Sequence, residues 1–146
     1  MQISIILAHP DPGSFNHAIA RAAVDRLRGN GHKVRFHDLY AEGFDPLLPA
    51  SEVPAGAALP PEIEAHCEEI VAADGIVIVH PNWWGQPPAV LKGWVDRVIR
   101  PGVAYNFLDG DTGEGIPVGL LRVRAAVVFN RFLLGGIENK TLQKRS

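Results

Sequence analysis

Val77-Ile-Val-His-Pro-Asn-Trp-Trp-Gly-Gln-Pro-Pro-Ala-Val-Leu-Lys-Gly-Trp94 passes from a β-branched run into two adjacent tryptophans and then into a helical pattern. Residues 75–79 predict a buried strand that Pro81 ends, because proline has no N–H to donate to a sheet. The Pro87-Pro88 pair suits the first turn of a helix, where that N–H is not needed. The loop between them therefore points outward and exposes two large rings, which indicates a binding surface. Packing of both rings beneath a neighbouring loop is the alternative.

Composition places the chain among globular proteins. Its 146 residues are 47% hydrophobic and 21% charged, which suits one domain with its own core. A net charge of −2 gives no broad attraction for nucleic acid, and no apolar run reaches the roughly twenty residues of a membrane helix. The start of the chain lacks the basic region of a signal peptide, and the single Cys67 excludes an internal disulfide. We therefore expect a cytoplasmic protein that neither binds nucleic acid nor inserts into a membrane.

One pair of residues is a candidate for metal binding. His66 and Cys67 are adjacent in a segment with a helical pattern. Neighbouring residues on a helix point in different directions, and the chain has no second cysteine. We therefore predict no metal site.

Apolar runs alternate with helical patterns along the chain. Nearly continuous apolar strands between helices are typical of a parallel sheet that is covered on both faces. We expect strands at 2–8, 33–39, 75–80 and 123–129, helices at 14–29, 62–73 and 88–99, and a long surface loop at 40–61.

The loop after the first strand predicts an anion site. In a doubly wound sheet, ligands bind beyond the carboxyl ends of the strands, where the strand order reverses. Residues 9–17 read His-Pro-Asp-Pro-Gly-Ser-Phe-Asn-His, in which Gly13 permits an unusual backbone angle. Ser14 and Asn16 can aim hydroxyl and N–H groups at a phosphate, although Ser14 as an ordinary N-cap is the alternative. Neither a G-x-G-x-x-G nor a P-loop pattern is present, which argues against both of those nucleotide sites. A phosphate loop beside an aromatic shelf can hold the two ends of a flavin nucleotide.

Three parts of the sequence resemble the NAD(P)H:quinone oxidoreductase family. They are residues 7–16, residues 38–46, and residues 81–98 followed by 102–107. The family includes the mammalian quinone reductases, the bacterial modulator-of-drug-activity proteins and the ancillary flavoproteins of potassium efflux systems. The resemblance implies a flavodoxin-like α/β fold, a doubly wound parallel sheet in three α/β/α layers, over residues 1–130.

The resemblance also implies the positions of the site. In this family the loop after the first strand holds the flavin phosphates, and the segment after the third strand lies under and beside the isoalloxazine ring. Trp84 would also form a wall of the substrate pocket, and Tyr105 and Phe107 either add to that wall or pack beneath it. Asp38 and Tyr40 match family positions as packing and turn residues. The cofactor-binding residues are then His9, Ser14, Phe15, Asn16, Pro81, Asn82, Trp83, Trp84 and Gly85. A surface imidazole at a strand end is the alternative for His9.

The implied activity is that of a flavin-dependent oxidoreductase. NADH or NADPH would pass a hydride to flavin N5 and leave, and a quinone or similar acceptor would then take the hydride in a ping-pong exchange. The family majority favours FAD, with FMN possible, and implies a homodimer.

The end of the chain departs from the family pattern. Residues 131–146 show no such resemblance and are too few for the helix and strand with which relatives continue. We therefore expect an atypical tail, a sheet that lacks its last strand and helix, and an exposed fourth strand. Two alternatives to an active enzyme stay open. They are a regulatory flavoprotein subunit of a membrane transport system and a non-catalytic truncated remnant.

Overall fold

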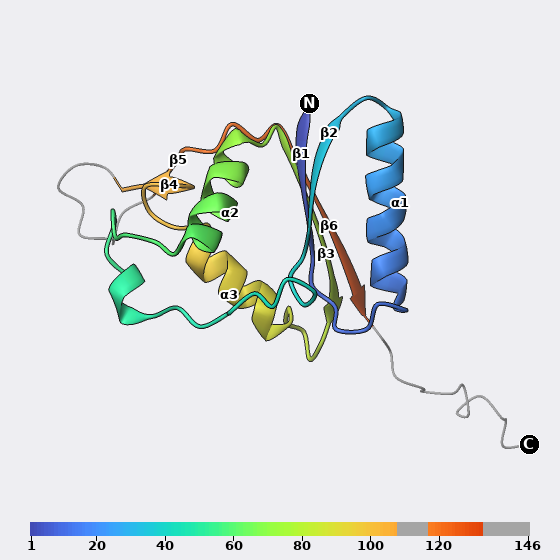
Figure 1. The fold of residues 1–146 in the computed structure, drawn as a ribbon, viewed down its shortest axis with the longest axis horizontal. Coiled ribbons are helices and arrows are strands. Elements are labelled where there is room, and N and C mark those ends of the chain that lie inside the picture. Colours follow the sequence, from blue (N-terminus) through green and yellow to red (C-terminus); the bar gives the residue numbers. More distant parts are fainter. Residues whose placement is uncertain (108–116, 133–146) are drawn as a thin grey trace, which may run out of the picture.

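The computed structural model describes residues 1–107 and 117–132 (Figure 1). Strands and helices alternate through the first hundred residues, as the apolar periodicity predicts. The elements are β1 (Gln2–Leu7), α1 (Phe15–Gly29), β2 (Lys33–Asp38), the 3₁₀ turn η1 (Ala50–Glu52), α2 (Pro61–Ala72), β3 (Gly75–Asn82), α3 (Ala89–Val98), β4 (Tyr105–Asn106), β5 (Val118–Gly119) and β6 (Ala125–Phe132).

Four parallel strands form the central sheet in the order β2-β1-β3-β6. Figure 1 shows α1 on one face of this sheet and α2 with α3 on the other. The chain places β2 on one side of β1 and β3 on its other side, so the strand order reverses between β1 and β3. The predicted three-layer parallel fold is confirmed. The carboxyl ends of β1 and β3 are the place where such a sheet binds ligands.

The core lies on both faces of β1, because successive side chains of a strand point to opposite faces. Ile5 and Leu7 are fully buried toward the α1 layer, whereas Ile6 is fully buried toward α2 and α3. The α2 and α3 side forms the larger cluster, which is built from Ile6, Ala8, Leu39, Ile63, Cys67, Ile70, Val90, Leu91, Trp94 and Val98.

β3 is longer than the sequence predicts. Pro81 does not end the strand, which continues to Asn82 and pairs with β6 along its whole length. Pairing with β1 stops at Val79, so the last residues of β3 have a strand neighbour on one side only. Pro81 is tolerated at this position because β1 no longer pairs with β3 beyond Val79, so no backbone hydrogen bond is needed on that side. This extension carries the tryptophan segment beyond the end of β1.

The segment 40–61 is largely the surface loop that the sequence predicts, with η1 within it, but it is anchored to α3. Glu52 is 3% exposed and receives two hydrogen bonds from Arg97 of α3, at 2.9 Å from Nε and 2.6 Å from Nη2. Arg100 donates to the backbone carbonyl of Glu52 at 2.6 Å. A Cβ on Gly93 of α3 would lie 2.3 Å from the Pro46 backbone, so only glycine permits this close approach. The segment therefore packs on α3 as part of the fold.

β6 lies at an edge of the sheet and is exposed along the described residues of its length. Val127 is 47% exposed, Val128 56% and Phe129 41%. Within residues 1–107 and 117–132, β3 is its only strand neighbour, which agrees with the expected exposed fourth strand. The strand continues to Phe132, past Asn130, and the rest of the expected atypical tail, from residue 133, lies outside the described residues. None of the described helices is long and apolar enough to cross a membrane.

Candidate functional site

Two loops meet at the carboxyl edge of the sheet. The first, residues 8–14, joins β1 to α1, and the second, residues 83–88, joins β3 to α3. His9 of the first loop lies between them, with its ring centroid 6.0 Å from that of Trp83 and 6.2 Å from that of His17. The fold therefore places the predicted anion loop and the predicted aromatic shelf side by side.

The first loop is closed by its own hydrogen bonds. The Asp11 carboxylate accepts from the Gly13 N–H at 2.8 Å, and the Asp11 carbonyl accepts from the Ser14 N–H at 3.0 Å. Ser14 is the N-cap of α1, and its Oγ accepts from the His17 N–H at 3.3 Å. The first-turn N–H groups of Phe15 and Asn16 are the ones for which a helix has no acceptor of its own. These two N–H groups are therefore the donors that this end of α1 offers to an anion.

Gly13 has a different role from the one predicted. It is absent from the residues of positive φ, so the loop does not depend on an unusual backbone angle at this position. A Cβ on Gly13 would instead lie 3.2 Å from the Asp11 carboxylate oxygen. The small residue lets that carboxylate turn back onto the backbone, and a larger one would push it away.

His17 links the first loop to β2, and the sequence did not predict this role. Its Nε2 donates to the Asp38 carboxylate at 2.9 Å, and its Nδ1 lies 2.9 Å from Ser14 Oγ. In a neutral imidazole with the proton on Nε2, Nδ1 is an acceptor, so the Ser14 hydroxyl donates to it. Ser14 is thus held as an N-cap, which is the alternative that the sequence left open, and its role toward a phosphate stays a prediction. A histidine three residues after an N-cap serine, with an aspartate at the end of the next strand, is the sequence signal that could have predicted these Ser14–His17–Asp38 hydrogen bonds.

Two asparagines at the rim have buried side-chain oxygens without partners. Asn16 is 3% exposed, and its Oδ1 has no hydrogen-bond partner within the described residues. The same holds for Oδ1 of Asn82 at the end of β3. A buried acceptor without a donor costs about 1–3 kcal/mol, which a bound molecule with N–H or O–H groups would recover. Asn16 lies in the first turn of α1 beside the first loop, and Asn82 ends β3 beside the second. Each half of the rim therefore fits a ligand group that donates an N–H or O–H, which a phosphate does not.

The aromatic segment is a tight turn with its rings outside the core. Trp83 and Gln86 exchange two backbone hydrogen bonds, each of 3.0 Å. The central residues Trp84 and Gly85 have φ of 56° and 80°, the sign pattern of a type I′ turn. Trp84 is the one described non-glycine residue with positive φ, and it is 100% exposed. Strain of this kind gathers at binding sites, and the turn confirms that the loop points outward.

Tyr105 and Phe107 are not brought to this rim. Their rings contact each other edge to face, at a centroid separation of 5.6 Å. β4 lies near α2 and the amino ends of the strands, far from the turn that precedes α3 (Figure 1). The sequence had left packing beneath the pocket wall as the alternative for these two residues.

A cavity and a cation complete the rim. The cavity, of about 280 Å³, lies between the loops that follow β1 and β2 and is lined mainly by His9, Pro10, Pro12, His17, Asp38 and Tyr40. The Arg131 guanidinium of β6 lies 4.5 Å from the centroid of the Phe15 ring, which is itself 59% exposed. The sequence did not predict Arg131 at the site, because only the pairing of β6 with β3 carries it to the anion loop.

Comparison with known proteins agrees with this geometry. The family described as "Flavodoxin-like fold" matches residues 1–139, which includes part of the tail in which the sequence showed no resemblance. An uncharacterized NAD(P)H oxidoreductase of Haemophilus influenzae is 39% identical over 121 residues, which cover 81% of this chain and 57% of that protein. NAD(P)H dehydrogenase [quinone] 1 of Rattus norvegicus is 34% identical over 70% of this chain and 44% of its own length.

A solved structure agrees as well. The NAD(P)H:quinone oxidoreductase of Methanothermobacter marburgensis superposes with a TM-score of 0.77 at 31% identity, over 90% of this chain and 66% of that one. The chain spans about half the length of the curated relatives that it matches. On sequence and structure together, the chain belongs to the flavodoxin-like family that contains the NAD(P)H quinone oxidoreductases.

Proposed function

We propose that this chain is a flavin-dependent NAD(P)H oxidoreductase that reduces a quinone or a similar acceptor. The observation that carries the proposal is the common rim, where an anion loop and an exposed tryptophan turn lie together, each next to a buried side-chain oxygen without a partner in the described residues. The relatives that share this sequence are named as NAD(P)H oxidoreductases and quinone dehydrogenases, which supports the same chemistry.

The two loops divide the cofactor between them. The first-turn N–H groups of α1 and the Arg131 side chain offer donors and positive charge to the phosphates. The turn after β3 offers backbone groups, the Asn82 amide and two indole faces to the flat ring. We assign the phosphate end to His9, Ser14, Phe15 and Asn16, and the ring end to Pro81, Asn82, Trp83, Trp84 and Gly85.

A bound flavin would supply the hydride chemistry, and the chain would supply position and exclusion of water. The Trp84 ring, which has no contact with the core to hold it, forms the outer wall beside which NAD(P)H and acceptor bind in turn. Two reactants that use one face in succession give ping-pong kinetics, and their rate depends on orientation in parallel planes. FAD is the expected flavin. We further propose a cytoplasmic homodimer, in which Tyr105 and Phe107 serve a substrate wall.

Flavin titration with mass identification of the bound species tests the proposal. We expect one flavin per chain, retained through gel filtration, and NAD(P)H oxidation that depends on added quinone. The matched variants are Asn16→Leu at the rim and Asn30→Leu at the exposed end of α1, where the side chain makes no hydrogen bond in the described structure. Binding that fails in the wild type, or that both variants lower equally, would contradict the assignment. Flavin binding without turnover would instead favour a regulatory flavoprotein.

A further inference from the structure

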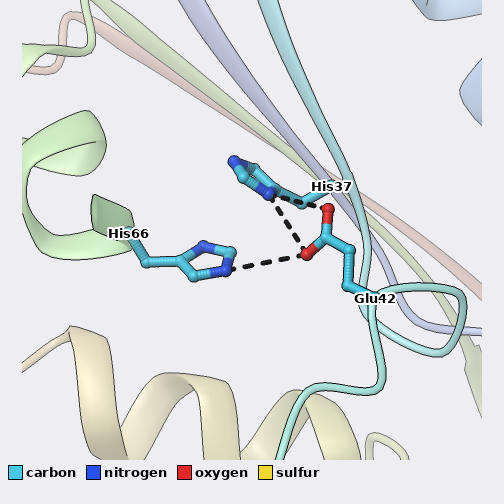
Figure 2. A group of neighbouring side chains, drawn as sticks. All are labelled: His37, Glu42 and His66. Atoms are coloured by element: carbon cyan, nitrogen blue, oxygen red, sulfur yellow. Dashed lines mark hydrogen bonds and ion pairs between the residues drawn. The ribbon is translucent and has the colours of Figure 1, made fainter. Parts of the chain in front are cut away.

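Three titratable side chains from separate parts of the chain converge on the α2 side of the sheet. Figure 2 shows His37 near the end of β2, Glu42 in the turn that follows it, and His66 of α2, with both imidazoles directed at the Glu42 carboxylate. His37 Nδ1 lies 3.0 Å and 3.3 Å from the two carboxylate oxygens, and His66 Nε2 lies 3.7 Å from one of them. These three residues are the His-Glu-His cluster, and it lies outside the rim described above.

The dimensions of the cluster match those of a metal centre. One ligand atom from each residue can be chosen so that all lie within 4.8 Å of one another. Ligands at about 2.0–2.1 Å from a tetrahedral Zn²⁺ are about 3.3 Å apart, so both contacts of the carboxylate are close to the required spacing. A small rotation of the two rings, whose centroids are 4.2 Å apart, would bring the nitrogens together.

Groups around the cluster already orient one of its imidazoles. The Nε2 of His37 donates to the Glu69 carboxylate at 2.8 Å, which leaves Nδ1 to face Glu42. Metal-binding histidines commonly have this arrangement, in which one ring nitrogen holds the metal and the other donates to a carboxylate. The Glu42 and Glu69 carboxylates thus lie against the two nitrogens of the same ring. The same negative charges would attract a cation.

His66 is held by a group that competes with a metal. The Trp94 Nε1–H donates to His66 Nδ1 at 3.3 Å, so the proton of a neutral His66 sits on Nε2 and points at Glu42. A metal at Nε2 moves the proton to Nδ1, and the Trp94 N–H then loses its acceptor. This competition provides a test that a purely structural network would fail.

An adjacent cavity leaves space for a further ligand. It measures about 140 Å³ and is lined by residues that include Glu42, Phe44, Asp45, Ile63, His66 and Arg97. Three protein ligands with one position open to water are the arrangement of catalytic zinc sites. The Arg97 guanidinium at the wall is already engaged by Glu52 at 2.6 Å, so it does not cancel the negative charge of Glu42.

We propose that His37, Glu42 and His66 bind one divalent transition-metal ion, with Zn²⁺ as the fitting ion, through two imidazole nitrogens and one carboxylate. Two imidazoles and a carboxylate suit Zn²⁺ and Co²⁺ better than Mg²⁺ or Ca²⁺, which prefer oxygen ligands. This site is separate from the flavin proposal. It departs from the sequence prediction of no metal, which considered His66 only with Cys67 and did not include the long-range approach of His37.

The experiment is titration of the full chain with Zn²⁺ and with Co²⁺, after treatment with a chelator. We expect one ion per chain and a tetrahedral Co²⁺ absorption spectrum without a thiolate charge-transfer band, since Cys67 is not a ligand. His66→Gln and Glu42→Gln should each weaken binding at least tenfold. The matched controls are His32→Gln near the N-terminus and Glu68→Gln, which is exposed on the same helix α2. Both controls should bind as the wild type does.

A third variant tests the ligand atom. Trp94→Phe removes the competing donor, so we expect it to bind Zn²⁺ about fivefold more tightly or better. Unchanged affinity in this variant would overturn the assignment of His66 Nε2. Absence of 1:1 binding in the wild type, or equal losses in the cluster variants and the controls, would show that the cluster is only a hydrogen-bonded network and would overturn the proposal. None of these readouts depends on flavin.

Discussion

The two loops of the rim differ in how their conformations are held. The loop after β1 is closed by internal hydrogen bonds, and its anchor His17 is tied to both Ser14 and Asp38. The turn after β3 exchanges only the two backbone bonds of its own closure and holds Trp84 fully exposed at positive φ. Under the proposed function, a charged group would therefore bind at a helix end that is already closed by hydrogen bonds. A flat ring would bind at a strained turn in which the Trp84 ring is free of the core.

The buried asparagines give the largest expected effect, because one flanks each loop and each has a side-chain oxygen without a partner in the described residues. Asn82→Leu and Asn16→Leu should each weaken flavin binding about 5- to 150-fold, the equivalent of about 1–3 kcal/mol for a lost buried hydrogen bond. The free energy of unfolding of the flavin-free protein should stay the same or rise, since the replaced oxygen has no partner there. Fluorescence titration with flavin and chemical denaturation measure the two quantities. A large loss of stability with unchanged flavin affinity would show that the two asparagines stabilise the fold and do not bind flavin.

The second effect belongs to the strained turn. Trp84→Gly should lower quinone reduction about 3- to 10-fold, the scale of a lost aromatic contact. Positive φ costs a non-glycine residue about 1–2 kcal/mol, so glycine at this position relieves that strain. The greater flexibility of glycine in the unfolded chain offsets about 0.5–1 kcal/mol of the relief. With a fully exposed ring, no core packing is lost, so the free energy of unfolding should not fall. Steady-state kinetics and thermal denaturation are the measurements. A parallel fall in activity and melting temperature would indicate that the Trp84 ring packs against the rest of the protein.

A substitution in the loop after β1 should lower stability more than it lowers flavin binding. Ser14→Ala removes the N-cap of α1 and the partner of His17, which should lower the free energy of unfolding by about 1 kcal/mol. The effect on flavin binding should be smaller than that of the asparagine variants, because the N–H groups of Phe15 and Asn16 remain in place. Ser51→Ala, in the 3₁₀ turn η1, is a control that leaves α1 intact. Loss of flavin affinity without loss of stability would make Ser14 a direct ligand instead of a cap.

The smallest effect lies at the opposite edge of the sheet and depends on pH. The backbone N–H of Gln2 donates to Asp74 at 2.8 Å, and this bond lowers the pKa of Asp74 below its ordinary value, with a further contribution from Arg122. A carboxyl whose pKa is lower in the folded state stabilises the fold above its unfolded pKa, and this stabilisation is lost as the pH falls through the folded pKa.

Asp74→Asn should therefore lower stability at neutral pH, and its difference from the wild type should shrink below about pH 4. Denaturation at a series of pH values measures this difference, and flavin affinity serves as the internal control that should not change. A difference that stays constant down to pH 2 would show that the side chain acts without its charge.

Sequence periodicity was sufficient for the layers and for the place of the site. The β-branched runs of β1 and β3 fix which strands are buried, and the turn residues after them fix the two loops at one edge. It was insufficient wherever a contact joins distant segments. The extension of β3 through Pro81 depends on where β1 stops, and the burial of Glu52 depends on Arg97 of a later helix. No local pattern records either contact.

The same reason separates the predicted from the unpredicted site residues. Ser14 and Asn16 lie in one short segment, from which the sequence predicts an anion site, and the family resemblance adds His9 to it. His17 needs Asp38, Arg131 needs the pairing of β6, and the His-Glu-His cluster needs β2 and α2 to pack together. β4, which contains Tyr105, shows the converse, since its closeness in sequence to α3 does not place it near the first turn of that helix.

A crystal structure of the protein with its bound flavin tests the central claim most directly. We expect phosphate oxygens within hydrogen-bond distance of the Phe15 and Asn16 N–H groups and the ring beside the Trp83–Gly85 turn, within reach of the Asn82 side chain. A flavin bound elsewhere, or one whose phosphates and ring avoid one of the two loops, would contradict the account.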